Sequence, residues 1–211
     1  MPHVGVPIFN KLILKSGKQM IKKALSLIFS GLIVFGLLDL EAKQQKNEPR
    51  KYTIAHIETN YGSVEIILFP EVAPKATENF ISLAKNGSYD NCPFHRIIPD
   101  GWIQTGDCSK AGGQSIWGAT FEDEFSDNVL FDAPGRLAMA NKGPNTNATQ
   151  FFITTVATPW LHKRHSIFGQ VIKGLDTVKK IESLGSGKGY FSQPWFGKKR
   201  EEPKIIKIEI V

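Results

Sequence analysis

Residues 94–107 read Phe-His-Arg-Ile-Ile-Pro-Asp-Gly-Trp-Ile-Gln-Thr-Gly-Asp, and this stretch decides the fold. Two short apolar runs, 94–98 and 102–105, lie on either side of Pro99-Asp100-Gly101. A proline fixes φ and a glycine accepts a positive φ, so these three residues are typical of a tight turn. The stretch therefore predicts a β-hairpin with Gly101 at the positive φ.

A hairpin centred on Asp100 places two pairs of residues opposite each other. Arg96 faces Gln104, and Cys92 faces Cys108. Directly opposed side chains of paired strands lie within contact range. The sequence therefore predicts that a glutamine amide holds the guanidinium group, which is a rigid fork of hydrogen-bond donors.

Other runs rich in β-branched and aromatic residues predict further strands. Two of these runs meet at Asn60-Tyr61-Gly62 and predict a second hairpin. At the end of the chain, isoleucines alternate with charged residues, which is typical of a half-buried strand. The strands predicted in addition to the first hairpin cover residues 52–59, 63–69, 137–140, 150–155, 166–173 and 206–210.

Two helices are predicted. Pro74 begins the first, which ends near Asn86 with Gly87 beyond it, the usual order of proline first and glycine last. The second covers residues 177–184, with Asp176 as its N-cap. Many short strands and only two helices indicate a mostly β protein.

The formal net charge of +6 comes entirely from the start of the chain. Residues 1–51 hold nine of the 26 Lys and Arg residues and three of the 20 Asp and Glu residues, which leaves seventeen of each sign in residues 52–211. The predicted globular part has no net basic charge with which to follow a phosphate backbone. We therefore predict no nucleic-acid partner.

The first 42 residues are predicted to be a signal peptide or a signal anchor. Lys22 and Lys23 precede an uncharged apolar run at 24–38, which is the form of a secretory signal. The run is shorter than the roughly 20 apolar residues of a comfortable membrane span. We expect an exported protein, periplasmic or otherwise extracytoplasmic (a secretory lumen in a eukaryote), that touches a membrane only through this segment. A polar linker at 43–51 and a globular domain at 52–211 follow.

The first hairpin resembles the signature of the cyclophilins, the cyclosporin-binding peptidyl-prolyl cis/trans isomerases. Two further blocks stand at family-like spacing. One is Gly-Arg-Leu-Ala-Met-Ala-Asn at 135–141 with Gly-Pro-Asn-Thr-Asn at 143–147 and Gln-Phe-Phe-Ile-Thr-Thr at 150–155, and the other is Trp160-Leu161, His165 and Phe-Gly-Gln-Val at 168–171. The resemblance covers residues 52–211.

The resemblance implies a closed antiparallel β-barrel capped by two short helices, here preceded by the N-terminal hydrophobic helix. It implies rotation of X-Pro bonds in polypeptides, without a cofactor or a metal, by a monomer. Rotation meets a barrier of about 18–20 kcal/mol because it breaks amide resonance. A catalyst of this step needs a dry pocket for the proline ring and a donor aimed at the twisted imide.

The resemblance also assigns the site residues. It implies catalytic roles for Arg96, Gln104, Phe152 and His165. Substrate binding falls to Trp102, Ala140, Asn141, Gln150, Trp160 and Leu161, and Trp160 occupies the position that contacts cyclosporin. His95 neighbours Arg96 on the strand, points to the opposite face and is expected to be a satisfied core histidine.

The chain departs from the family pattern at the hairpin. Gly101 stands where the family has an aromatic residue, and Trp102 stands where it has methionine. At the groove rim, Lys142 replaces a small residue, Ala-Thr at 148–149 stands for Gly-Ser, and His-Lys-Arg at 162–164 replaces an acidic-glycine turn. The two hairpin departures keep open an alternative function, a barrel that binds proline peptides without turnover or acts as a chaperone, while the rim departures mainly alter the rim and its charge.

The two cysteines are too few for a zinc site, and Cys92 with His95 lacks an orienting acid for nucleophilic catalysis. As opposed residues in an exported protein, Cys92 and Cys108 are candidates for a disulfide. Free buried thiols are the alternative.

Overall fold

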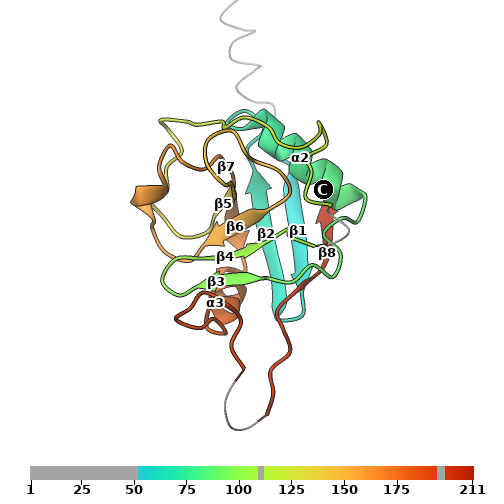
Figure 1. Ribbon diagram of the computed structural model, residues 1–211, viewed down its shortest axis with the longest axis vertical. Helices are drawn as coiled ribbons and strands as arrows, with labels where there is room; N and C mark the ends of the chain where they lie inside the picture. Colours follow the sequence, from blue (N-terminus) through green and yellow to red (C-terminus); the bar gives the residue numbers. More distant parts are fainter. Residues whose placement is uncertain (1–51, 109–111, 194–197) are drawn as a thin grey trace, which may run out of the picture. The chain divides into compact units, whose positions relative to one another are not determined.

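Eight strands form one antiparallel sheet in the computed structural model, which describes residues 52–108, 112–193 and 198–211 (Figure 1). The strand order in the sheet is β3-β4-β6-β5-β7-β2-β1-β8. The strands are β1 (Ile54–Thr59), β2 (Gly62–Leu68), β3 (Arg96–Ile98), β4 (Trp102–Thr105), β5 (Arg136–Met139), β6 (Phe151–Thr154), β7 (Ile167–Lys173) and β8 (Ile205–Ile210). The predicted mostly β architecture with two helices is confirmed.

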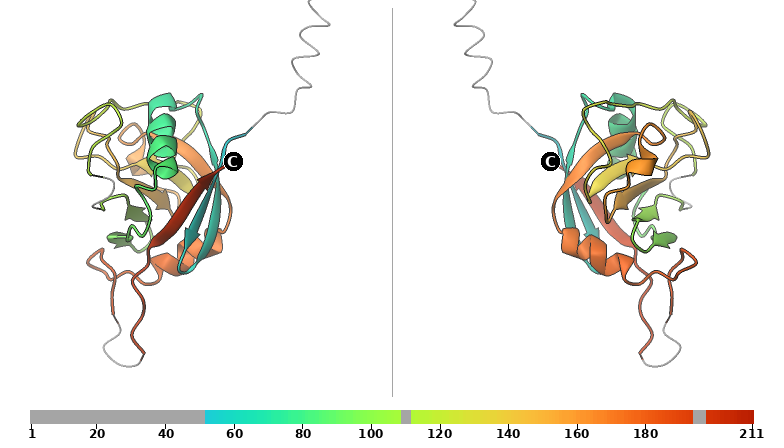
Figure 2. Two further views of the ribbon diagram at one scale, coloured as in Figure 1. Left: turned by 90° about the vertical axis from the view of Figure 1, so that its right-hand side faces the viewer. Right: turned by 90° about the vertical axis from the view of Figure 1, so that its left-hand side faces the viewer.

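The sheet curls so that its two edge strands approach each other (Figure 2). β3 and β8 are joined just outside their ladders by an isolated bridge between Pro93 and Lys204. The N–H of Phe94 donates to Pro203 O at 2.9 Å, and the N–H of Ile205 donates to Cys92 O at 2.9 Å. The barrel is therefore closed at this point by a bridge rather than by a continuous ladder.

Helix α2 covers Pro74–Lys85 and begins at the predicted proline. Its buried face includes Ala76, Phe80 and Leu83, which pack against the sheet. The carboxylate of Glu124 accepts the N–H groups of Lys75 (3.0 Å) and Ala76 (2.9 Å) at the helix N-terminus. These two donors have no partner within a helix, so a side chain from another part of the chain satisfies them.

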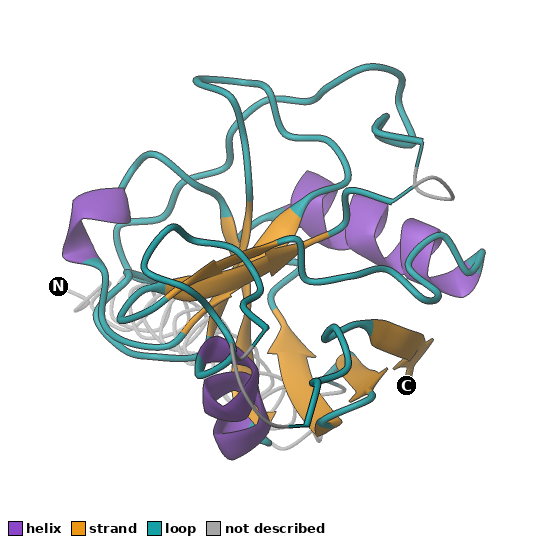
Figure 3. Ribbon diagram, turned by 60° about the horizontal axis from the view of Figure 1, so that its bottom comes forward, coloured by secondary structure: helices purple, strands orange, loops and turns teal. Residues whose placement is uncertain are grey.

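Helix α3 covers Leu175–Glu182 and begins earlier than predicted. Its N-cap is Gly174, at a φ of 84°, and Asp176 lies in the first turn, so the prediction of Asp176 as N-cap was wrong. The chain needs a glycine here because a Cβ at residue 174 would lie 2.2 Å from Ser63 O. The helices α2 and α3 lie at opposite ends of the sheet (Figure 1). The helices of the described residues surround the sheet rather than pass between its strands (Figure 3).

The turn between β3 and β4 differs from its prediction in one respect. Asp100, and not Gly101, adopts the positive φ, at 54°. A Cβ on Gly101 would lie 3.0 Å from Ile98 Cγ2 and 3.3 Å from Ile98 O. Glycine is favoured at residue 101 because the turn is crowded, rather than because of its φ.

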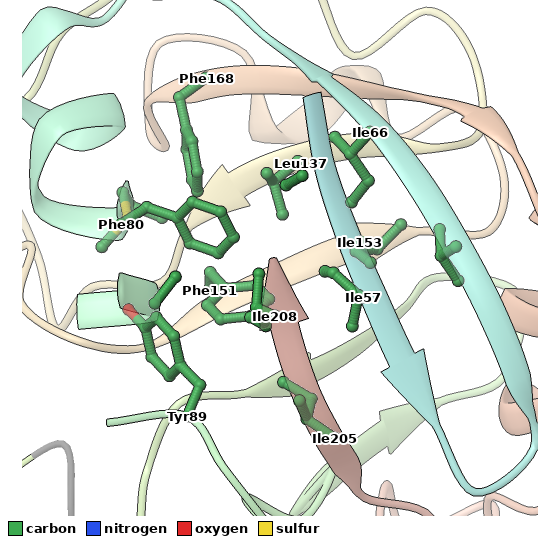
Figure 4. Close-up of a cluster of buried hydrophobic side chains, with 14 of the residues drawn as sticks. Ile57, Ile66, Phe80, Tyr89, Leu137, Phe151, Ile153, Phe168, Ile205 and Ile208 are labelled. Atoms are coloured by element: carbon green, nitrogen blue, oxygen red, sulfur yellow. The ribbon is translucent and has the colours of Figure 1, made fainter. Parts of the chain in front are cut away.

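The main core fills the inside of the curled sheet (Figure 4). Four buried aromatic rings from α2, its following loop, β6 and β7 pack together at ring separations of 5.2–5.7 Å: Phe80, Tyr89, Phe151 and Phe168. A second, smaller cluster consists of Phe131, Ala138, Phe152, Leu161 and Ile167. This second cluster lies beside the predicted site.

The described residues 52–211 form one compact unit. Within them, no helix has both the length and the apolar character of a membrane span. Our predictions of a signal segment and a polar linker concern residues 1–51 and lie outside the described residues.

Candidate functional site

The site is built on the β3–β4 hairpin, whose register agrees with the prediction. Arg96 pairs with Gln104, Ile97 with Ile103, and Ile98 with Trp102. The Nη1 group of Arg96 donates to Gln104 Oε1 at 3.3 Å. Arg96 is exposed, whereas Gln104 is buried, so a guanidinium open to solvent is held by an amide that is not.

Trp102 contacts the same two residues. Its indole N–H donates to Gln104 Oε1 at 3.3 Å, and its ring centroid lies 5.3 Å from Arg96 Cζ. On its other side, the ring lies 5.7 Å from that of Phe152. The half-buried indole therefore forms a wall between the guanidinium and the second apolar cluster.

The orientation of the Gln104 amide follows from its partners. Its nitrogen donates to Gln150 Oε1 at 2.8 Å, so its oxygen must face the two donors of Arg96 and Trp102. Gln104 lies on β4 directly opposite Phe152 of β6. The ladder thus brings an arginine, two glutamines and an aromatic ring to one place.

Phe152 is the centre of the apolar part of the site. It is 2% exposed. Phe131 stacks on it at 6.0 Å, and the His165 ring meets it edge-on at 5.2 Å. Leu161, from the short helix η1 (Pro159–Leu161), completes this cluster.

Phe131 is a site residue that our sequence analysis did not identify. It lies in a loop, outside all three quoted blocks, and its N–H donates to Nδ1 of His162 at 3.1 Å. Its only signal in the sequence is its place at the end of the short apolar run Val129-Leu130-Phe131, which does not separate a pocket wall from ordinary core.

Burial of His165 favours its neutral form. Its Nδ1 lies 2.9 Å from the carbonyl oxygen of Met139, and burial lowers its pKa. Because a carbonyl only accepts, Nδ1 carries the proton and Nε2 is left as an acceptor. A neutral imidazole at the edge of the Phe152 cluster keeps that cluster free of a buried charge.

A surface pocket of about 300 Å³ lies next to this cluster. Ala140, Asn141 and Gln150 line it, together with Lys142 and Ala148, two of the residues that depart from the family pattern. The N–H of Ala140 donates to Gln150 O at 2.9 Å, so this amide is already used within the protein.

The side-chain amide of Asn141 is also used: its nitrogen donates to the Arg164 carbonyl oxygen at 2.8 Å. Trp160 is 57% exposed on η1 and points to solvent, whereas its neighbour Leu161 is buried. The structure therefore gathers the predicted residues around Phe152, with Trp160 at the outer rim.

His95 differs from its prediction as a satisfied core histidine. It is half-buried, and its Nδ1 has no hydrogen-bond partner among the described residues. Burial lowers its pKa, and the charge of Asp107 opposes this effect. The reason is that β3 begins only at Arg96, so His95 lies beyond the end of the strand rather than in the sheet.

Cys92 and Cys108 are joined in a disulfide, with their Cα atoms 5.5 Å apart. Of the two alternatives left by the sequence, the structure has the bonded form. Among residues 52–108, 112–193 and 198–211, no group of three or more His, Cys, Asp or Glu side chains could hold a metal ion.

Comparison with known proteins agrees with this geometry. The family model described as "Cyclophilin type peptidyl-prolyl cis-trans isomerase/CLD" matches residues 54–210. The chain belongs to the cyclophilin-type peptidyl-prolyl cis-trans isomerase family.

Several relatives are much longer than this chain. The chain is 52% identical over 154 residues to peptidyl-prolyl cis-trans isomerase CYP71 of Arabidopsis thaliana, a match that covers 72% of this chain and 23% of the relative. The match to peptidyl-prolyl cis-trans isomerase cyp15 of Rhizopus delemar is 49% identical and covers 75% of this chain and 24% of the relative. The chain therefore spans about a quarter of the length of these relatives.

A relative of similar length is peptidyl-prolyl cis-trans isomerase-like 1 of Gibberella zeae, which is 42% identical with coverage of 74% of this chain and 93% of the relative. Among solved structures, a cyclophilin-type isomerase of Cryptosporidium parvum superposes with a TM-score of 0.68 at 38% identity. The match covers 76% of this chain and 98% of that structure. A second crystal structure of that protein, in the presence of the dipeptide Ala-Pro, gives a TM-score of 0.67 at 38% identity, and the match covers 75% of this chain and 98% of that structure.

Proposed function

We propose that this chain catalyses cis/trans isomerisation of X-Pro peptide bonds in folding or flexible polypeptides. The observation that carries the proposal is the position of Arg96, whose guanidinium is open to solvent and is held by Gln104 and Trp102 beside the Phe152 cluster. The guanidinium supplies a hydrogen-bond donor, and the half-buried ring of Trp102 beside the buried Phe152 cluster offers an apolar surface to a proline ring.

This arrangement suits the energetics of the reaction. Rotation of the imide bond localises the lone pair on the proline nitrogen, and the barrier of about 18–20 kcal/mol reflects the resonance lost. A donor that meets the nitrogen only in the twisted state lowers the barrier, because only interactions stronger in the transition state accelerate a reaction. Arginine stays protonated at all relevant pH values, so the donor needs no proton transfer.

Each site residue then has a part in the proposal. Phe152, Trp102 and Leu161 hold the proline ring, with neutral His165 at its edge. Gln104 orients Arg96, and Gln150 orients Gln104. The extended chain of the substrate lies along Ala140 and Asn141, next to the 300 Å³ pocket.

A second candidate function is binding of proline peptides without turnover. The observation that favours it is the indole of Trp102, which covers one face of the guanidinium and shares its glutamine partner. An arginine committed to internal contacts would hold a peptide without assisting rotation.

The deciding experiment measures isomerisation of a short X-Pro peptide by the purified chain and by Arg96→Ala. We expect the loss of this donor to lower kcat/KM by about 10²–10³, by analogy with oxyanion-hole deletions. Arg200→Ala, at an exposed loop position, is the matched control and should keep the wild-type rate. A wild-type rate equal to the uncatalysed rate, with peptide binding retained, would establish the second function instead.

We also propose that the protein is exported, on the basis of the signal-like segment at 22–38, and that it acts as a monomer, as the family resemblance implies. The proposal extends to cyclosporin as a ligand of the same groove, because Trp160 is exposed beside Leu161. Titration of the purified chain with cyclosporin, followed by tryptophan fluorescence, tests the last point.

A further inference from the structure

Glu182 lies at an unfavourable end of its helix. It is the last residue of α3 (Leu175–Glu182), where the helix dipole is negative and a carboxylate is destabilising. The side chain is half-buried and not turned into solvent. A carboxylate at this place therefore needs partners outside its own helix.

The structure provides those partners in the turn of the β3–β4 hairpin and directly after β6. One oxygen, Glu182 Oε1, accepts the N–H of Asp100 at 2.8 Å and the hydroxyl of Thr155 at 2.5 Å. Thr155 in turn donates its own N–H to Gly101 O at 2.9 Å. The carboxylate thus ties together the hairpin turn and the end of β6.

The bond to Asp100 holds a residue that lies in the left-handed region of φ. Asp100 adopts a φ of 54°, which is uncommon for any residue other than glycine. Among the described residues, the Asp100 N–H has no acceptor other than Glu182 Oε1. By accepting that N–H, Glu182 favours this turn over alternatives that would shift the strand following it.

The chain after Glu182 packs against the outer edge of the same hairpin. The N–H of Ile97 donates to Gly189 O at 2.9 Å, and a Cβ on Gly185 would lie 2.6 Å from Ile97 Cγ2. In Figure 1, α3 lies next to β3. The hairpin is therefore supported along its edge and at its tip by one continuous segment.

Trp102 is the first residue of β4 and directly follows the turn that Glu182 supports. It pairs with Ile98 across the hairpin and with Thr154 on β6. Its ring contacts both the Arg96 guanidinium and Phe152. A small displacement of the turn would therefore change the position of the indole, and with it the two groups on which isomerisation is proposed to depend.

We propose that Glu182 is a positioning residue for isomerisation: its carboxylate fixes the turn at Asp100 and, through it, the indole of Trp102 against Arg96. Glu182 itself touches no substrate. This inference rests on the proposed function, and it names a residue of α3 that acts on the site from outside the groove.

The test compares the full chain with Glu182→Ala, Glu182→Gln and Glu182→Asp, in assays of a short X-Pro peptide well below the unfolding transition. We expect Glu182→Ala to lower kcat/KM by about 10-fold, because displacements of about 1 Å have large effects on rate. Glu182→Gln should retain most of the activity, since its amide oxygen accepts the same two hydrogen bonds. Glu182→Asp keeps the charge but is too short for both donors, and should resemble Glu182→Ala.

Two controls separate positioning from general destabilisation. Glu78→Ala, at an exposed position of α2, should leave kcat/KM unchanged. In a Trp102→Ala background, Glu182→Ala should cause no further loss, because the residue through which it acts is absent. A wild-type kcat/KM in both folded Glu182→Ala and Glu182→Asp, or the same 10-fold loss in the Trp102→Ala background, would overturn the proposal.

The indole N–H resonance of Trp102 gives a readout that does not depend on activity. In an NMR spectrum, Glu182→Ala should shift this resonance and Glu182→Gln should not. An unchanged resonance in Glu182→Ala would contradict the positioning role. A wild-type chain without activity would instead contradict the proposed function, whatever the resonance does, so the two failures are distinguishable.

Discussion

Trp102 and Arg96 share a single acceptor, the side-chain oxygen of Gln104, at 3.3 Å from each donor, while the indole ring lies 5.3 Å from the guanidinium carbon. The indole therefore competes with the guanidinium for a hydrogen bond and also attracts it through the face of its ring.

Replacing Trp102 separates its contact with the guanidinium from its role as a wall of the site. We expect Trp102→Met to change kcat/KM by only about 3-fold, because an exposed cation–π contact of about 0.5–1 kcal/mol is lost while a thioether still fills the wall. Trp102→Ala opens the wall, and we expect a loss of at least about 10-fold, most of it in KM. Peptide isomerisation at several substrate concentrations measures both. Trp117→Ala, outside the site, is the control, and an equal effect of all three variants would contradict the prediction.

The disulfide between Cys92 and Cys108 encloses the whole β3–β4 hairpin, with a sequence separation of 16. Closing a loop of this length stabilises a protein by about 3 kcal/mol, chiefly through the unfolded state. We expect the Cys92→Ala/Cys108→Ala variant to lose about this much free energy of unfolding in urea. Reductant should have the same effect on the wild type and none on the variant. Equal stability of the wild type with and without reductant would argue against the bond.

The cap of α2 predicts a second stability effect. Glu124→Ala leaves the N–H groups of Lys75 and Ala76 without their acceptor, and we expect the free energy of unfolding to fall by about 1–2 kcal/mol. Glu122→Ala is the matched control, because Glu122 pairs only with the exposed ammonium of Lys75. Glu122→Ala should change the free energy of unfolding in urea only slightly. A similar loss of this free energy in Glu124→Ala and Glu122→Ala would assign the effect to the lost charge rather than to the helix cap.

The two histidines near the site predict how stability depends on pH. Burial lowers the pKa of both His165 and His95 in the folded state. The unfolded chain then binds more protons below its own histidine pKa of about 6.5, so the free energy of unfolding is highest above pH 6.5 and falls as the pH falls through this value.

Urea denaturation between pH 8 and pH 5 measures this dependence. We expect His165→Gln to reduce the slope of stability against pH between pH 6.5 and 5, and the double variant with His95→Gln to reduce it further. A slope that is identical in the wild type and the double variant would show that these histidines are not the source.

Much of the site was predictable because it is local. The opposition of Arg96 and Gln104 follows from a three-residue turn and the two-residue period of a strand, and the structure has this register. The same counting paired Cys92 with Cys108, although it could not decide between thiols and a disulfide. The turn itself was harder, since crowding against Ile98, rather than the φ of Gly101, explains its glycine.

The sequence by itself determined the hairpin, most strand positions and the family, because these depend on neighbours within a few residues. Only the tertiary structure decided that Phe131 stacks on Phe152, that Glu124 caps a helix 49 residues away, and that Glu182 holds a turn 82 residues away. Such partners meet because the sheet curls and brings its loops and helices against one another. No periodicity or turn chemistry along the chain records which distant side chains then fall within hydrogen-bond distance.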